Sequence, residues 1–417
     1  MINEREVVLD SLLEILENGE YSHIVEKAVL DKHDYLKQNE KAFIKRVTEG
    51  TIENLLAIDE IINRYAKTKT NKQKKIIRNI LRMSVYQILY MDKVPSAAVC
   101  NEAVKLAGKR GFRTLGGFVN GVLRNIVRDK AKLEKEKIST MPDWIVEHFE
   151  KEFGKEKAEI IIEAFDKPSP VTIRGRRKLK ESALYTPVPL EDNVYTLTSG
   201  ASLREIEGYE DGAFVVQDID SMSVCKMAEI KEGMLVIDVC ASPGGKSIQA
   251  YDLGARVISC DISDYKVNNI RSNLERCQIE ESSLEKVLGK EGSFVALVQD
   301  ATIYNSLFEE KADIVIADVP CSGLGVLGKK SDIRFKTSSE DLLSLPKIQR
   351  TIIDNVYHYV KKGGILMYST CTLNSKENEE QVKYITENLP FELLDEKLFV
   401  PGIDKGDGFY VAKLVRK

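Results

Sequence analysis

The sequence predicts a multidomain chain in which an all-helical N-terminal domain precedes an α/β domain built on a mostly parallel sheet. Three observations lead to this prediction. The chain has 417 residues, more than one hydrophobic core usually organises. Over about the first 130 residues, apolar side chains recur every three to four positions, which is typical of amphipathic helices. After about Tyr195, short β-branched runs alternate with helical patterns, which indicates a parallel sheet covered by helices on both faces.

The expected domains are residues 1–130, helical; residues 131–194, a helical or α+β connector; and residues 195–417, the α/β domain. In the first domain, apolar residues at helical spacing run from Val8 to Leu16, and Gly19 is placed to end that helix. A second such run extends from Ile76 to Ile88. The connector carries five basic residues that we expect to face RNA: Arg174, Arg176, Arg177, Lys178 and Lys180.

Five segments of the α/β domain are predicted as parallel strands from their length and their β-branched content. They are Leu235–Val239, Arg256–Ser259, Phe294–Val298, Asp313–Ala317 and Gly364–Tyr368. We expect the closing GDGFYVAKLVRK to form one more strand, antiparallel at the far side of the sheet.

The net charge of −4 conceals a strongly basic stretch. From Ile61 to Arg128 there are 15 lysine or arginine residues against only Asp92 and Glu102. This excess predicts a surface that binds RNA phosphates, with a solvated helix face as the alternative. Because the sequence has no long uncharged apolar run and starts with charged residues, we expect neither a membrane partner nor secretion, and a cytoplasmic location.

Seven cysteines, spread from Cys100 to Cys371, show neither disulfide-framework nor metal-ligand spacing. We therefore expect reduced thiols and no metal site. Four of the cysteines are expected to be small buried hydrophobic residues: Cys100, Cys225, Cys260 and Cys277.

A candidate cofactor loop, VIDVCASPGGKS, stands where the first predicted strand ends and a helix begins. In open α/β sheets, ligands bind at the carboxyl ends of the strands, where glycines let the backbone approach closely. The loop matches neither GxGxxG nor a Walker pattern, so a phosphate cradle is poorly supported. The candidate binding residues of this loop are Cys240, Ala241, Ser242, Pro243, Gly244, Gly245 and Lys246.

Four carboxylates follow four successive predicted strands: Asp238, Asp261, Asp300 and Asp318. Asp261 comes 23 positions after Asp238, where an acidic residue accepts hydrogen bonds from ribose hydroxyls. The four together suit a ligand with an adenosine and a positive sulfonium, as in S-adenosylmethionine, rather than a phosphate. The alternative is that each aspartate only caps the helix that follows it.

Two cysteines, in ADVPCSG and YSTCTLN, are expected on loops after the fourth and fifth strands, on the cofactor side of the sheet. Carbon 5 of cytosine is a poor nucleophile, so its methylation needs prior addition of a thiolate to carbon 6. Cys321 and Cys371 offer such a thiol, and Asp318 offers an acid three positions before Cys321. Lys246 is expected to order the cofactor loop or the catalytic groups, with a solvated lysine as the alternative.

With DVCASPGGK, DVPCSG and STCTLN in this order, the chain from about Val215 onwards resembles the two-cysteine RNA cytosine-5 methyltransferases. The resemblance implies a Rossmann-like S-adenosylmethionine methyltransferase domain with a seven-stranded, mostly parallel sheet. It also implies that Cys371 is the nucleophile and that Cys321 helps to release the product. DNA cytosine methyltransferases attack with the other cysteine, so no DNA partner is expected. The stretch KKSDIRF differs in detail from the family's common form.

In the N-terminal half, NEAVKLAGKRG and GFVNGVLRNI resemble the helical domain of the antitermination factor NusB. Joined to this catalytic domain, it resembles a family of bacterial methyltransferases of 16S ribosomal RNA. The implied partner is therefore 16S ribosomal RNA, naked or in an early small-subunit particle. A transfer RNA cytosine-5 methyltransferase is the nearest alternative. The others are a non-catalytic, antitermination-like RNA-binding factor and a methyltransferase of proteins or small molecules.

Overall fold

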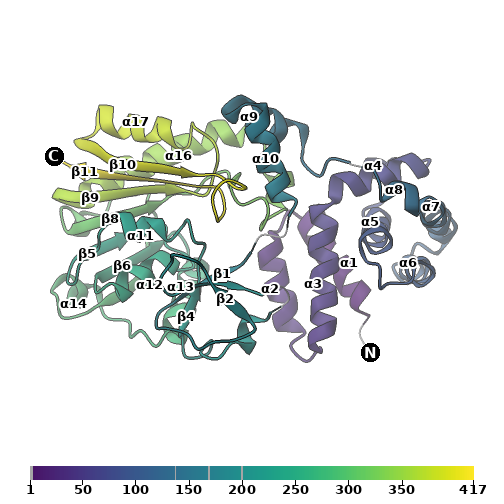
Figure 1. Ribbon diagram of the computed structural model, residues 1–417, viewed down its shortest axis with the longest axis horizontal. Helices are drawn as coiled ribbons and strands as arrows, with labels where there is room; N and C mark the ends of the chain where they lie inside the picture. Colours follow the sequence, from purple (N-terminus) through teal and green to yellow (C-terminus); the bar gives the residue numbers. More distant parts are fainter. Residues whose placement is uncertain (1–2, 137, 168–169, 199–200) are drawn as a thin grey trace. The chain divides into compact units, whose positions relative to one another are not determined.

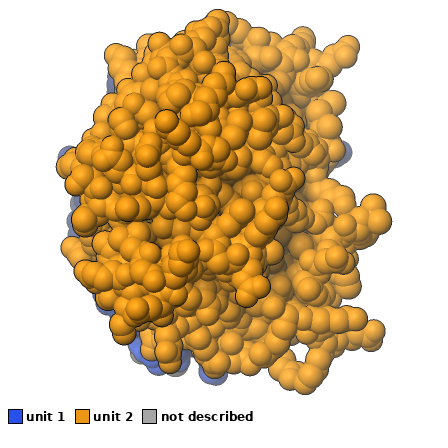
Figure 2. Space-filling model, turned by 90° about the vertical axis from the view of Figure 1, so that its left-hand side faces the viewer, with its two compact units in different colours: residues 1–147, 330–336 blue, residues 148–329, 337–417 orange. Residues whose placement is uncertain are grey.

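The computed structural model describes residues 3–136, 138–167, 170–198 and 201–417. The chain divides into two compact units, which are coloured separately in Figure 2. We call residues 1–147 together with 330–336 the helical unit, and residues 148–329 together with 337–417 the α/β unit.

The helical unit is built from helices, as predicted. Its longer helices are α1 (Glu4–Glu17), α2 (Ser22–Lys32), α3 (Gln38–Glu53), α4 (Leu55–Tyr65), α5 (Lys75–Tyr90), α6 (Ser96–Lys109) and α7 (Gly116–Arg128). Short helical segments are η1 (Thr70–Lys72), η2 (Arg113–Leu115), α8 (Lys130–Leu133) and α15 (Ile333–Lys336), and α9 (Asp143–Phe153) crosses the boundary between the units. The side chain of Asn3 caps α1 by accepting from the Arg5 amide. The chain leaves α1 through Gly19, whose φ of +86° suits glycine.

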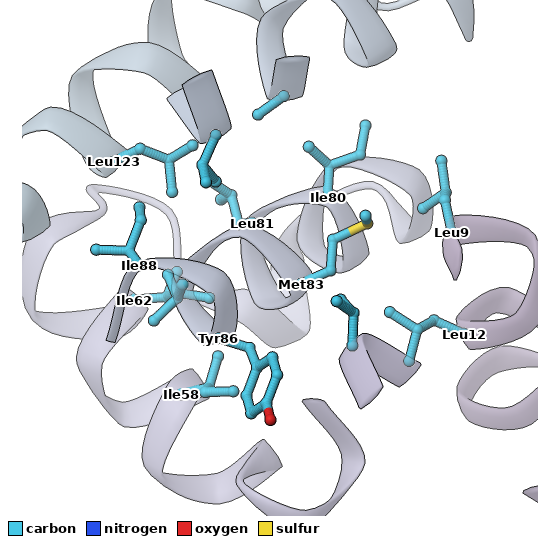
Figure 3. Close-up of a cluster of buried hydrophobic side chains, with 14 of the residues drawn as sticks. Leu9, Leu12, Ile58, Ile62, Ile80, Leu81, Met83, Tyr86, Ile88 and Leu123 are labelled. Carbon is cyan, nitrogen blue, oxygen red and sulfur yellow. The ribbon is translucent and has the colours of Figure 1, made fainter. Parts of the chain in front are cut away.

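Helix α5 is the centre of this unit. From Asn79 to Leu89 every side chain of α5 is buried, which requires other helices on all its sides. Figure 3 shows residues of α5 among residues of α1, α4 and α7: Leu9, Leu12, Ile58, Ile62, Ile80, Leu81, Met83, Tyr86, Ile88 and Leu123. A Cβ atom on Gly50 of α3 would lie 2.1 Å from Cζ of Tyr86, so only glycine fits beside this ring.

A segment from far along the chain completes the helical unit. Asp332 accepts a hydrogen bond from the Ser22 amide at 2.9 Å, and Arg334 donates to the Thr140 hydroxyl at 3.2 Å. Both charged side chains are only 2% exposed, and Phe335 packs against the helical core. The DIRF sequence therefore makes buried structural contacts within this unit.

After the end of α9, the α/β unit continues with α10 (Lys155–Phe165) and a small antiparallel sheet of order β2-β3-β1-β4. Its strands are β1 (Thr172–Gly175), β2 (Tyr185–Pro187), β3 (Val194–Leu197) and β4 (Phe214–Val216). Arg174 and Arg176 form ion pairs of 2.8 and 2.9 Å with Asp252 of α12 (Gly245–Asp252). The prediction that these two arginines face RNA is therefore wrong, because both are held against the larger sheet's first helix.

The large sheet has seven strands in the order β10-β11-β9-β8-β5-β6-β7. The strands are β5 (Leu235–Asp238), β6 (Arg256–Asp261), β7 (Phe294–Val298), β8 (Ala312–Asp318), β9 (Val360–Thr370), β10 (Phe391–Phe399) and β11 (Phe409–Arg416). Strands β5 to β9 are mutually parallel, whereas β11 pairs antiparallel with both β9 and β10. The predicted mostly parallel sheet and its antiparallel final strand are confirmed.

Helices cover both faces of this sheet. On one face, α16 (Asp341–Val356), α17 (Glu379–Asn388) and α14 (Leu284–Leu288) contribute to a buried cluster. On the other face, α11 (Ser223–Met227), α12 and α13 (Asp264–Arg276) contribute to a second cluster. Figure 1 shows α16 and α17 along one side of the strands.

Strand β10 was not predicted, because its burial is confined to its two ends and the residues between carry no core pattern. Among the described residues, no helix is both long enough and apolar enough to span a membrane.

Candidate active site

The candidate site lies at the carboxyl ends of β5, β8 and β9. Strand β5 lies between β8 and β6, so the sheet order changes direction beside it. At such a switch point the loops leaving neighbouring strands diverge, and ligands bind in the crevice between them. Because β5, β8 and β9 are parallel, the loops that begin at Val239, Val319 and Cys371 all leave the sheet at this edge.

The cofactor loop has the backbone that its glycines suggest. Gly244 has a φ of +103° and precedes the first residue of α12, a left-handed conformation that other residues adopt only under strain. The Ser242 amide donates to the Asp261 carboxylate at 2.9 Å, which ties the loop to the end of β6. Burial raises the pKa of Cys240, so this loop cysteine stays a neutral thiol.

Asp238 has the features of a ligand-binding carboxylate. Its side chain is 1% exposed, and its Oδ2 accepts from the Ser247 hydroxyl at 2.7 Å. Its Oδ1 is buried and accepts no hydrogen bond within the described part of the chain. Burial raises the pKa of Asp238 to about 7, against the lowering effect of Ser247. An orphaned buried oxygen of this kind suits a donor or a positive charge on a bound ligand.

Asp261 and Asp300 occupy the ends of neighbouring strands. Asp261 accepts from the amides of Ser242 and Ile262, and helix α13 is capped by the Ser263 side chain. Helix capping is therefore not the role of Asp261. Asp300 accepts from the amide and hydroxyl of Thr302 at 2.8 and 2.7 Å, which fixes the turn after β7.

Lys246 and Asp318 form an ion pair in the centre of the site. Lys246 Nζ lies 2.7 Å from Asp318 Oδ2, and the Ser369 hydroxyl donates to Asp318 Oδ1 at 2.9 Å. Burial alone would lower the pKa of Lys246, but the charge of Asp318 and its hydrogen bond outweigh burial and raise the pKa. The Lys246 side chain is 13% exposed and lies over the Phe409 ring, so the solvated alternative is wrong.

The two candidate cysteines meet. Sγ of Cys321 lies 3.4 Å from Sγ of Cys371, although 50 residues separate them in the chain. The hydrogen bond with Cys371 raises the pKa of Cys321, and burial adds to this effect. Cys321 is therefore a neutral thiol that can donate its proton toward Cys371. The four cysteines predicted to be structural are all buried: Cys100, Cys225, Cys260 and Cys277.

A buried polar network behind the two cysteines was not predicted. Glu377 is fully buried, and it accepts hydrogen bonds from the residues that follow each cysteine, Ser322 and Asn374. The motif TLNSKENEE places polar residues just after Cys371, which is the signal that could have revealed this network.

The basic side chains of the helical unit divide into two groups. Six of the fifteen between Ile61 and Arg128 form ion pairs with carboxylates: Arg64, Arg78, Arg82, Lys105, Lys109 and Arg110. The residue count therefore overstates the free positive charge. Five exposed lysines around η1 form no ion pair among the residues that the structure describes: Lys67, Lys69, Lys72, Lys74 and Lys75.

Two family models match this chain. Residues 226–415 match the model described as 16S rRNA methyltransferase RsmB/F, and residues 2–128 match the NusB family. The "Probable ribosomal RNA small subunit methyltransferase B" of Bacillus subtilis (strain 168) is 29% identical, over 99% of this chain and 98% of that protein. The "Ribosomal RNA small subunit methyltransferase B" of Escherichia fergusonii is 26% identical, over 100% and 99%.

Solved structures share the fold. The crystal structure of PH0851 aligns with a TM-score of 0.80 and 18% identity, over 100% of this chain and 99% of that one. NSun6 from Pyrococcus horikoshii, solved with SFG, aligns with a TM-score of 0.56 and 20% identity, over 66% of this chain and 98% of that one. As a methyltransferase domain, the α/β unit has S-adenosylmethionine as its expected cofactor. The chain thus joins a domain that matches the NusB family to a domain that matches the 16S rRNA methyltransferase RsmB/F family.

Proposed function

We propose that this chain methylates carbon 5 of a specific cytosine in 16S ribosomal RNA through a covalent adduct between Cys371 and carbon 6. The observation that supports this chemistry best is the 3.4 Å separation of the Cys321 and Cys371 Sγ atoms, at the edge that also carries Asp318 and Lys246. The ribosomal substrate is supported by the names of the full-length relatives and by the NusB family domain. We place the reaction in the cytoplasm, where ribosomal RNA is made in bacteria.

S-adenosylmethionine, when bound, supplies the methyl group from its positive sulfonium. Asp261, at the end of β6, would accept hydrogen bonds from the ribose hydroxyls. The orphaned Oδ1 of Asp238 would accept from a donor on the cofactor, which removes the cost of leaving a buried oxygen unsatisfied. The loop from Cys240 to Gly245 and Asp300 would complete the site.

The first half of the reaction needs a thiolate and a turned-out base. Cys371 adds to carbon 6, so that an S–C bond forms and the electron pair of the ring double bond becomes available at carbon 5. The ammonium of Lys246 interacts electrostatically with Cys371, and a nearby positive charge favours a thiolate. Asp318 would accept from the cytosine amino group and keep the ring in place.

The second half of the reaction needs a base. After carbon 5 takes the methyl group, its proton must leave and the Cys371–carbon 6 bond must break. The largest effect that raises the pKa of Cys321 is its hydrogen bond with Cys371. Once the Cys371 Sγ atom is bonded to carbon 6 it carries no charge, so that hydrogen bond weakens. Cys321 would then lose its thiol proton to solvent more readily and, as a thiolate, accept the carbon 5 proton, while the C–H electron pair re-forms the ring double bond and the S–C pair returns to Cys371.

The test is methyl transfer from labelled S-adenosylmethionine to unmodified 16S ribosomal RNA and, in parallel, to unmodified transfer RNA. Label recovered as 5-methylcytosine at one site in 16S RNA supports both the chemistry and the substrate. Label only in transfer RNA keeps the chemistry and overturns the substrate. If neither RNA is labelled, a small-subunit particle is the next substrate, and failure there favours a non-catalytic RNA-binding factor.

Variants of the two cysteines separate their roles. Cys371→Ala should abolish transfer and leave cofactor binding intact. Cys321→Ala should accumulate a covalent protein–RNA adduct, which runs as a shifted band on a denaturing gel. Cys277→Ala, at a buried cysteine far along the chain from both motifs, is the matched control. Turnover at the wild-type rate in Cys371→Ala would remove this residue from the mechanism.

A further inference from the structure

We infer that Glu377 is a positioning residue, which links the two cysteine loops and so sets the distance between Cys321 and Cys371. This inference deepens the proposed function and rests on it for its consequence in catalysis. Glu377 follows Cys371 by six positions and does not reach the reacting sulfur atoms by any hydrogen bond among the described residues.

Both oxygens of the Glu377 carboxylate connect loops that come from different strands. Oε2 accepts from the amide of Ser322 at 2.9 Å and from the side-chain amide of Gln349 at 3.0 Å. Oε1 accepts from the hydroxyl of Ser322 at 2.6 Å and from the side-chain amide of Asn374 at 2.9 Å. Ser322 is the residue after Cys321, and Asn374 is the third residue after Cys371. One carboxylate thus joins the two loops directly.

The surroundings of Glu377 suit a hydrogen-bond acceptor. Three neighbouring residues donate all four hydrogen bonds, two of them from Ser322, and Gln349 is itself fixed because it also donates to the Pro320 carbonyl at 3.0 Å. A glutamine at this position would direct its own N–H groups at two of these donors. Glu377 is 0% exposed and forms no ion pair in the part of the chain that the structure describes. A buried charge without a counter-charge is costly unless hydrogen bonds satisfy it, as four do here.

Electrostatics indicates that the role of Glu377 is not to activate a thiol. The pKa of Cys321 is raised first by its hydrogen bond with Cys371 and then by burial, and the charge of Glu377 raises it further. The carboxylate therefore opposes ionisation of Cys321. A group that acts against thiolate formation, yet accepts four hydrogen bonds, serves the geometry of the loops.

Few other contacts join the two loops. The Gly325 amide donates to the Cys371 carbonyl at 3.0 Å, and the hydroxyls of Ser322 and Thr372 lie 2.7 Å apart. Without Glu377, the relative position of the two sulfur atoms depends on these contacts and on the pairing of β8 with β9. A misplacement of about 1 Å in a catalytic group lowers a rate by about 100-fold.

The first experiment measures the distance between the thiols without RNA or cofactor. Diamide oxidises two thiols to a disulfide, taking up their two electrons and two protons as it becomes a hydrazine. In the wild type, the two Sγ atoms need only close from 3.4 Å to about 2.05 Å. We expect Glu377→Gln to slow the formation of this disulfide at least tenfold, as followed by peptide mass spectrometry. If Glu377 acted only through its charge, the same variant would form the disulfide faster.

The matched control is Glu380→Gln, which makes the same chemical change at an exposed position on α17. This variant should form the disulfide at the wild-type rate. Alkylation of Cys260, which is 1% exposed, reports whether each variant is folded. Should Glu377→Gln not fold, Ser322→Ala removes the hydroxyl shared with Glu377 and Thr372 while keeping the charge, and we expect at least threefold slower disulfide formation.

The second experiment measures methyl transfer. Glu377→Gln should lower kcat by about 100-fold, with KM for S-adenosylmethionine within twofold of the wild type, whereas Glu380→Gln should leave both unchanged. Wild-type disulfide formation and wild-type kcat in a folded Glu377→Gln or Ser322→Ala variant would overturn the inference. Absence of methyl transfer by the wild type itself, with slow disulfide formation in Glu377→Gln, would instead overturn the proposed function and leave the positioning intact.

Discussion

Replacing Asp238 with asparagine should stabilise the α/β unit above neutral pH and weaken the binding of S-adenosylmethionine. Burial raises the pKa of Asp238 from 3.8 to about 7. The pKa of Asp238 is higher in the folded chain than in the unfolded chain. The contribution of its protonated carboxyl to stability is therefore complete below about pH 4 and is lost as the pH rises to about 7. A shift of about three units corresponds to roughly 4 kcal/mol at 1.36 kcal/mol per unit.

The measurable quantity is how the difference in stability between Asp238→Asn and the wild type changes with pH. Between pH 5 and pH 8, the stability of Asp238→Asn relative to the wild type should rise by about 3 kcal/mol, because the wild-type carboxyl is ionised in the unfolded chain at a pH where it is still protonated in the folded chain. The single tryptophan, Trp144, lies in the helical unit, so urea unfolding should be followed by hydrogen exchange of peptides from β5 and β6. Other buried carboxylates, such as Asp220, titrate in both proteins and cancel.

Asp192→Asn, which removes an exposed carboxylate from the same unit, is the control for the substitution itself. Calorimetric titration should show that Asp238→Asn binds S-adenosylmethionine about 10 to 100 times more weakly, because the loss of one hydrogen bond to a charged group lowers affinity by about this factor. A stability difference that stays constant from pH 5 to pH 8 would refute the reasoning, because Asp238 would then ionise in the folded protein at no cost.

Three further predictions concern the helical unit. Changing the exposed Lys72, Lys74 and Lys75 to glutamine should weaken RNA binding and lower the slope of log Kd against log salt by about 2. Changing the ion-paired Lys105 and Lys109 to glutamine should affect RNA binding less. An unchanged slope would assign RNA binding to another surface. Gly50→Ala should cost about 2 kcal/mol because its Cβ meets Tyr86, whereas Gly121→Ala, with open space around it, should gain up to about 1 kcal/mol in thermal unfolding. Equal stability of the two variants would contradict the close packing. Arg334→Ala should lower the free energy of unfolding of the helical unit by about 2 kcal/mol, which Trp144 fluorescence should report as a lower unfolding midpoint. A wild-type midpoint would argue against the buried contact with Thr140.

Local pattern was enough to predict the helical unit and the parallel strands. The run from Ile76 to Ile88 forms the buried α5, and Gly19 ends α1 as expected. The predicted ends of the strands were less accurate: β9 starts at Val360 rather than Gly364, because Val360 pairs with Ala312 of β8 before the register shifts to Ile314 and Ile365. The small antiparallel sheet was not predicted as a unit, because four strands of three or four residues leave little periodicity to read: β1 and β2 lie in the expected helical or α+β connector, whereas most of β3 and all of β4 lie after it.

Motif spacing predicted which residues meet at the strand ends, but not their partners. The sequence brought Cys321 and Cys371 to one edge, whereas their 3.4 Å separation depends on the pairing of β8 with β9. Charge counting misled where it ignored tertiary ion pairs, as with Arg174 and Arg82. Glu377 was missed because a charged residue in a polar loop is usually exposed, and the run of polar residues after Cys371 was not interpreted as a buried network.

The DIRF segment also determines when the helical unit can finish folding. A ribosome that has made residue 147 must add 189 more before Lys336 leaves the peptidyl-transferase centre. At 5 to 20 residues per second this takes about 10 to 40 seconds. During that interval the partners of Asp332 and Arg334, among them Ser22 and Thr140, are already synthesised but lack these contacts. The last native contacts of the first-made unit therefore form only after four of the seven strands of the large sheet, β5 to β8, have been synthesised.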